Sequence, residues 1–88
     1  MNKNLSPSFT LKECEQLIEY YSPLIISKNI LNDVPIEYLQ IRTYDNGENS
    51  VICFGKRDKE LPFKKDLCVV ALQLGLIHPN ELLKNLNL

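Results

Sequence analysis

The sequence of 88 residues contains no tryptophan, a single histidine and only three glycines. One histidine excludes a site built on paired histidines, and the Gly55-Lys56 pair lacks the other glycines of a phosphate-binding loop. Serine-hydrolase signatures and paired carboxylates in apolar surroundings are also missing. We therefore predict that the protein is not an enzyme and that it holds no metal and no cofactor.

The cysteines are few and odd in number: Cys14, Cys53 and Cys68. Their spacing matches no zinc or redox motif, so we expect reduced and mostly buried thiols. A catalytic pair of Cys68 with His78 is the remaining enzymatic alternative. The apolar neighbours of Cys68 speak against it, because they raise the pKa of a thiol and make it inert. We interpret His78 instead as a turn or helix-cap residue.

Long apolar runs are missing as well. No stretch approaches the roughly 18 to 20 apolar residues of a membrane span, and the start Met1-Asn2-Lys3-Asn4 leads into no signal-peptide core. Together with the reduced thiols, this predicts a cytoplasmic protein without a membrane partner. The formal net charge of −1 lacks the bulk basicity of a dedicated nucleic-acid binder.

The strongest positive signal is a β-hairpin over Ile36 to Lys56. Its turn is Asp45-Asn46-Gly47-Glu48, and Asn-Gly between alternating runs favours a two-residue type I′ turn. Centring the turn on Asn46-Gly47 predicts a register and places one apolar face toward the core. In that register the facing pairs are Thr43 with Ser50, Ile41 with Ile52, and Leu39 with Phe54.

Three helices are predicted around the hairpin. Thr10 and Glu13 form a capping box for the first helix, which we expect to end or kink at Ser22-Pro23. The second helix is predicted from Phe63 to Leu74 as the most buried one, and the third from Pro79 to Leu86. The result is an α+β domain of order α-β-β-α-α over residues 10–88, with the antiparallel hairpin packed on the helices and residues 1–9 as a flexible lead-in.

A two-stranded sheet would leave both edges unpaired. Leu24 to Asp33 reads equally well as a short buried strand or as another helical turn. Either Leu24 to Ile30 supplies a third strand or another chain does.

The second hairpin face carries contact-prone side chains. Tyrosine and arginine are enriched where proteins meet, because they combine contact area with directed hydrogen bonds. We therefore predict a protein–protein interaction module that binds another protein or itself, as a homodimer, through this face and an open strand edge. The predicted interface consists of Tyr38, Gln40, Arg42, Tyr44, Val51 and Cys53.

The alternative function is binding of a nucleic acid or a phosphate ligand. Lys64 and Lys65 would lie in the first turn of the second helix, where free amides suit an anion. Aromatic side chains on a sheet face can also stack on bases. The predicted contacts are Lys56, Arg57, Lys59, Lys64 and Lys65.

Overall fold

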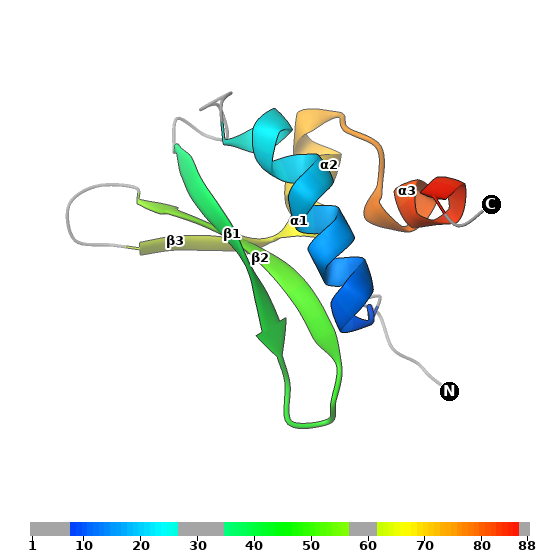
Figure 1. Cartoon of the computed structure of the whole chain (residues 1–88). Helices are drawn as coiled ribbons and strands as arrows, with labels where there is room; N and C mark the ends of the chain where they lie inside the picture. Colours follow the sequence, from blue (N-terminus) through cyan, green and yellow to red (C-terminus); the bar gives the residue numbers. More distant parts are fainter. Residues whose placement is uncertain (1–7, 27–34, 57–61, 87–88) are drawn as a thin grey trace.

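The computed structural model describes residues 8–26, 35–56 and 62–86. It confirms the α+β class, but the order is α-β-β-β-α-α, with one strand more than predicted. The elements are α1 (Leu11–Ile25), β1 (Ile36–Thr43), β2 (Asn49–Lys56), β3 (Pro62–Asp66), α2 (Leu67–Leu74) and α3 (Pro79–Leu86). Figure 1 shows the three helices grouped to one side of the sheet, with the tip of the β1–β2 hairpin extending away from them.

The capping box of α1 is confirmed. The Thr10 hydroxyl accepts from the Glu13 amide at 3.0 Å, and the Glu13 carboxylate accepts from the Thr10 amide at 2.9 Å. Of the predicted end or kink at Ser22-Pro23, the end is wrong, because the helix continues through Pro23 to Ile25. Tyr21 and Ile25 are both buried. Burial of the last turn therefore outweighs the hydrogen bond that a proline inside a helix removes.

The hairpin is present, but its register differs from the prediction by one residue. The Tyr44 amide donates to the Glu48 carbonyl at 2.8 Å, and the Gly47 amide donates to the Tyr44 carbonyl at 2.9 Å. Gly47 has a φ of +87°. This is a three-residue loop, Asp45-Asn46-Gly47, closed by a left-handed glycine, rather than a two-residue turn. The observed pairs include Arg42 with Ser50 and Ile41 with Val51.

A shift of one residue exchanges the two faces of β2. Val51 and Cys53 pair with Ile41 and Leu39 and lie in the core, 1% and 0% exposed. Their predicted place on the outer face is therefore wrong. At the start of β1 the register shifts between Ile36 and Tyr38, and Ile36 therefore also points into the core and is buried.

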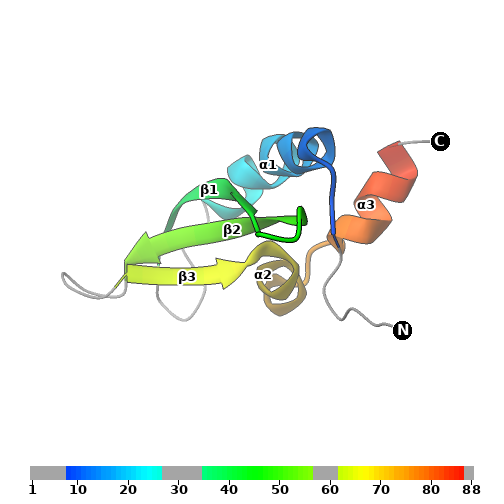
Figure 2. The same ribbon diagram turned by 90° about the horizontal axis from the view of Figure 1, so that it is seen from below.

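The third strand comes from a segment that we expected to be loop and helix. β3 pairs antiparallel with β2, so the sheet order is β1-β2-β3 (Figure 2). Phe63 points into the core and Lys64 is exposed, which is the alternation of a half-buried strand. Lys64 and Lys65 therefore lie on a strand, and the predicted helix start at Phe63 is wrong. Of the other proposed strand, Leu24 and Ile25 belong to α1, Ile26 caps its end, and residues 27–30 lie outside the described residues.

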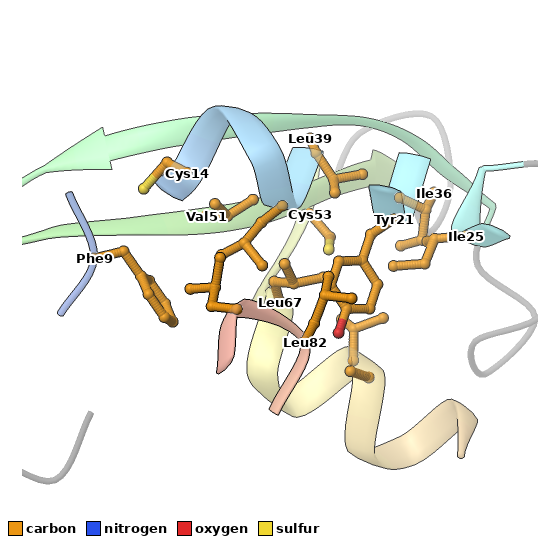
Figure 3. Close-up of a cluster of buried hydrophobic side chains, with 14 of the residues drawn as sticks. Phe9, Cys14, Tyr21, Ile25, Ile36, Leu39, Val51, Cys53, Leu67 and Leu82 are labelled. Carbon is orange, nitrogen blue, oxygen red and sulfur yellow. The ribbon is translucent and has the colours of Figure 1, made fainter. Parts of the chain in front are cut away.

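The core lies between the inner face of the sheet and the helices. Tyr21 is fully buried there, and its hydroxyl donates to the backbone carbonyl of Ile77 between α2 and α3. Figure 3 shows the Tyr21 side chain inside this cluster. The buried cluster consists of Phe9, Cys14, Leu17, Tyr21, Ile25, Ile36, Leu39, Val51, Cys53, Phe63, Leu67, Val70, Ala71, Leu82 and Leu83.

The chain passes from β3 into α2 without a loop (Figure 2). Asp66 ends the strand and caps the helix, and its carboxylate accepts from the Cys68 amide at 2.7 Å. Gly75 ends α2 in the left-handed conformation, at a φ of +72°, which glycine adopts without steric cost. The helix is buried on one side only, since Leu72 is 76% exposed. Its apolar segment, which predicted the most buried helix, thus leaves apolar side chains exposed on the other side.

α3 runs from Pro79 to Leu86, as predicted. Leu82 and Leu83 are buried, whereas Leu86 is 51% exposed. Residues 1–7 of the predicted lead-in lie outside the described residues. Phe9 is buried, and its amide donates to the Asn49 carbonyl at 3.3 Å, so this residue belongs to the folded domain.

Candidate functional site

The candidate site is the face of the sheet turned away from the helices, which we call the outer face. The register and the alternation of side chains along each strand define its members. It consists of Tyr38, Gln40 and Arg42 on β1, Tyr44 directly after β1, Ser50, Ile52 and Phe54 on β2, and Lys64 and Asp66 on β3. Tyr38, Gln40, Arg42 and Tyr44 are thus together as predicted, and Ile52 and Phe54 take the places expected for Cys53 and Val51.

An aromatic pair forms one end of the outer face. Tyr38 and Phe54 lie opposite each other on neighbouring strands, and their rings stack with centroids 5.0 Å apart and planes 6° apart. Tyr38 is 47% exposed. The stacked rings therefore form an aromatic pair on the outer face that spans β1 and β2.

Polar and cationic groups form the end near the hairpin turn. The Arg42 guanidinium lies 5.3 Å from the centroid of the Tyr44 ring, which is within the range of a cation–π interaction. The Tyr44 hydroxyl lies 3.2 Å from the Ser50 hydroxyl, in a hydrogen bond that either group can donate. These contacts fix the orientation of Tyr44 while its ring remains 41% exposed.

The central strand lies beneath these side chains. Ile52 and Ser50 are only 8% and 7% exposed, although they lie on the face opposite to Val51 and Cys53 of the core. Ile52 is also outside the buried cluster of the core. Ser50 and Ile52 are therefore buried on the central strand, between the exposed side chains of the two edge strands.

The basic residues are divided between the two faces of β3. Lys64 is exposed on the outer face, directly opposite Phe54. Lys65 faces the other way, with its ammonium 5.5 Å from the centroid of the Phe63 ring. The Asp66 carboxylate occupies the start of α2, so the predicted anion site of helix amides and two lysines is not formed. Arg57, Lys59 and the side chain of Lys56 lie outside the described residues.

The remaining polar groups are structural in character. His78 accepts from the Asn80 amide through Nδ1 at 3.0 Å, which is the predicted cap interaction. Burial, followed by the negative charge of Asp66, raises the pKa of both Cys53 and Cys68 to about 12. Protonated thiols are poor nucleophiles and poor metal ligands. In the described ranges, no three His, Cys, Asp or Glu side chains come together in a way that could hold a metal ion.

Because buried groups of the folded protein have raised pKa values, we predict that its free energy of unfolding falls at alkaline pH. Burial also raises the pKa of Tyr21 to about 12, whereas the ordinary values are 9.0 for the thiols and 10.0 for tyrosine. The folded chain holds these protons more tightly than the unfolded chain does. The stabilisation of the folded chain by these protons is fully present below pH 9 and is lost as the pH rises toward 12. We expect the free energy of unfolding, measured in urea, to stay level from about pH 7 to 8.5 and to fall steadily above pH 9.

The two cysteines provide the control for this measurement. Cys68 is half-buried, so Cys68→Ser is tolerated better than a change at Cys53, which is fully buried. The Cys68→Ser variant should lose less stability between pH 9 and 11 than the wild type. An equal alkaline loss in both proteins would show that the Cys68 proton contributes nothing.

Comparisons with protein-family models, with curated proteins and with solved structures found no match to this chain. Among the helices of the described residues, none has the length and apolar character required to cross a membrane.

Proposed function

We propose that this domain is a protein–protein interaction module without catalytic activity, and that it binds through its outer face and the edge of β1. The observation that carries the proposal is the aromatic and cationic layer formed by the Tyr38–Phe54 pair and the Arg42–Tyr44 pair. Tyrosine and arginine dominate the energetic centres of protein interfaces. In the described part of the chain, α1, α2 and α3 all contribute side chains to the core cluster on the inner face, opposite this layer.

The geometry of the aromatic pair favours a protein partner over stacked bases. Rings that lie flat on a sheet offer their faces to nucleobases. Tyr38 and Phe54 instead face each other, so each ring has one face already covered. The exposed ring edges and the Tyr38 hydroxyl suit the mixed apolar and hydrogen-bonding contacts of a protein interface.

The test places a photo-crosslinking amino acid at Tyr38 in the cells that make the protein. The matched control is the same replacement at Tyr20, whose side chain on α1 is 41% exposed, close to the value for Tyr38. We expect protein adducts from position 38 and none of comparable yield from position 20. Adducts of equal yield from both positions, or from neither, would contradict the proposal.

A second candidate function is binding of a nucleic acid or phosphate ligand, and Lys64 is the observation that favours it. Its ammonium stands on the exposed outer face beside Phe54, where a cation and an aromatic ring could engage a nucleotide together. The same crosslinking experiment separates the two functions. An adduct from position 38 that nuclease treatment removes would transfer the proposal from a protein partner to a nucleic acid.

A further inference from the structure

The two edges of the sheet are protected to different degrees. Exposed strand edges invite pairing with another chain, and natural proteins block them with charges, especially lysine, and with proline. The β3 strand has a charge or a proline at four of its five residues, whereas β1 has a charge at two of its eight, Glu37 and Arg42. The protecting residues of β3 are Pro62, Lys64, Lys65 and Asp66.

The backbone of β1 also offers its free groups in a regular row. The Tyr44 amide donates toward β2, and the register is constant from Tyr38 to Thr43. In an antiparallel pair the direction of the backbone groups alternates along the strand. The groups of Arg42, Gln40 and Tyr38 therefore also point to β2. Those of Leu39, Ile41 and Thr43 point to the edge, where no described strand lies.

We propose that a second copy of this chain pairs antiparallel along β1, with Gln40 of both copies on the two-fold axis. The inference rests on the proposed function and names its partner. This register places Leu39 opposite Ile41 of the second copy, so that apolar side chains meet on the inner face. It also brings together the edge-directed backbone groups of these two residues, which can exchange hydrogen bonds.

On the outer face the same register places Tyr38 opposite Arg42 of the second copy. One face of the Tyr38 ring is covered by Phe54 on the β2 side. The other face is directed to the open edge, where a guanidinium from the second copy completes a cation–π contact. The two neighbouring two-fold registers are poorer. Centring on Leu39 sets Glu37 against Ile41, and centring on Ile41 sets Leu39 against Thr43.

The paired molecules form one continuous sheet with the order β3-β2-β1-β1-β2-β3 and a joined outer face. Pairing of a single strand with its copy buries less surface than a standard protein interface of about 1,600 Å². We therefore expect association in the micromolar range or weaker, which is detected by light scattering over a protein concentration of about 10 μM to 1 mM.

A cysteine on the axis tests the register directly. Residues in a non-hydrogen-bonded antiparallel pair have Cα atoms about 4.5 Å apart, within the range that a disulfide can bridge. Gln40→Cys should form a disulfide-linked dimer on mild oxidation at least about tenfold faster than Gln73→Cys, a control in which the exposed glutamine of α2 is replaced. Equal rates for the two variants would overturn the proposal.

Charge at position 40 distinguishes this register from its neighbours. With Gln40 on the axis, Gln40→Lys and Gln40→Glu both place like charges opposite each other, and each should weaken the dimer about fivefold. With Ile41 on the axis, position 40 faces Arg42, so Gln40→Glu would strengthen the dimer while Gln40→Lys would weaken it. A stronger Gln40→Glu dimer would therefore overturn the register.

The outcomes also separate this inference from the proposed function. A wild-type chain that remains monomeric up to about 1 mM overturns the pairing of β1 with its copy. Crosslinking from Tyr38 to a different protein would then leave the proposed function intact with another partner. Loss of both the dimer and the Tyr38 adducts would remove the proposed function as well.

Discussion

Replacing Tyr21 by alanine should lower the free energy of unfolding by about 4 kcal/mol, the middle of the range for deleting a buried aromatic ring. Tyr21 is fully buried and lies in the cluster where α1, the sheet, α2 and α3 meet. Domains of this size have a total stability of roughly 4 to 13 kcal/mol. The alanine variant should therefore lose a third or more of its stability, or fail to fold at 37 °C.

Tyr21→Phe isolates the hydroxyl group and remains informative if the alanine variant does not fold. The hydroxyl donates to the Ile77 carbonyl, which connects α1 to the segment between α2 and α3. Removing it leaves a part-buried acceptor without this donor, so we expect a loss of about 1 to 2 kcal/mol in urea unfolding. An unchanged midpoint in Tyr21→Phe would show that this hydrogen bond contributes no net stability.

Tyr20→Ala is the matched control. Tyr20 is adjacent in sequence, is 41% exposed and packs edge-on against Tyr21 with ring centroids 5.0 Å apart. An exposed edge-to-face partner contributes about 1 kcal/mol, so this variant should lose much less than Tyr21→Ala. Equal losses at both positions would contradict the central role of Tyr21 in the core.

Gly55→Ala should destabilise the domain by about 3 kcal/mol, the upper end of the range for an overfilled site. A Cβ atom at Gly55 would overlap the Pro35 carbonyl oxygen and lie 3.1 Å from its carbonyl carbon. Both are backbone atoms at the start of β1, so they cannot move aside as a flexible side chain can. Without this overlap, alanine would stabilise a strand by about 0.5 to 1 kcal/mol relative to glycine. A net loss in Gly55→Ala therefore requires a steric cost larger than this gain.

Gly47→Ala separates overlap from backbone strain. Nothing lies within 4 Å of a Cβ at Gly47, but its φ of +87° is unfavourable for alanine. The expected loss is about 1 to 2 kcal/mol. The measurement is urea unfolding of both variants, and their free energies of unfolding can be compared if the dependence on urea concentration is the same for both. If Gly55→Ala lost no more than Gly47→Ala, the close approach of Pro35 would have no energetic weight.

The position of the hairpin could be predicted from the sequence, but its register could not. Asn46-Gly47 correctly marks where the chain reverses. Two loops are compatible with these residues, one with glycine second of two and one with glycine third of three, and they differ by one residue in register. The apolar pattern does not decide between them, because Val51, Ile52, Cys53 and Phe54 are all hydrophobic and either alternate pair can face the core.

Other differences arise where tertiary packing overrides a local signal. Pro23 suggests a helix end, yet burial of Ile25 extends α1 beyond it. The segment from Pro62 to Asp66 contains only one strand-favouring residue, Phe63, and its pairing with β2 makes it a strand. Local preferences of single residues could not reveal a strand that exists because β2 offers a free edge.

The candidate site was predicted in part for the same reason. Tyr38, Gln40, Arg42 and Tyr44 could be placed on one face from β1 alone, since alternation within a strand does not depend on its partner. The contribution of β2 depends on register, so Phe54 and Ile52 were missed. Lys64 and Asp66 belong to the outer face only because β3 is a strand, and the local sequence does not predict that strand.

The order of the strands along the chain has a consequence for the speed of folding. Each strand of the sheet pairs with its neighbour in sequence, so the β1-β2-β3 meander closes only short loops. The distant contacts are made by the flanks: Phe9 with Asn49, 40 residues apart, and Tyr21 with Ile77, 56 residues apart. Closing long loops costs chain entropy before any contact repays it. The meander can therefore form early at low entropic cost, and docking of α1 against the segment after α2 sets the height of the folding barrier.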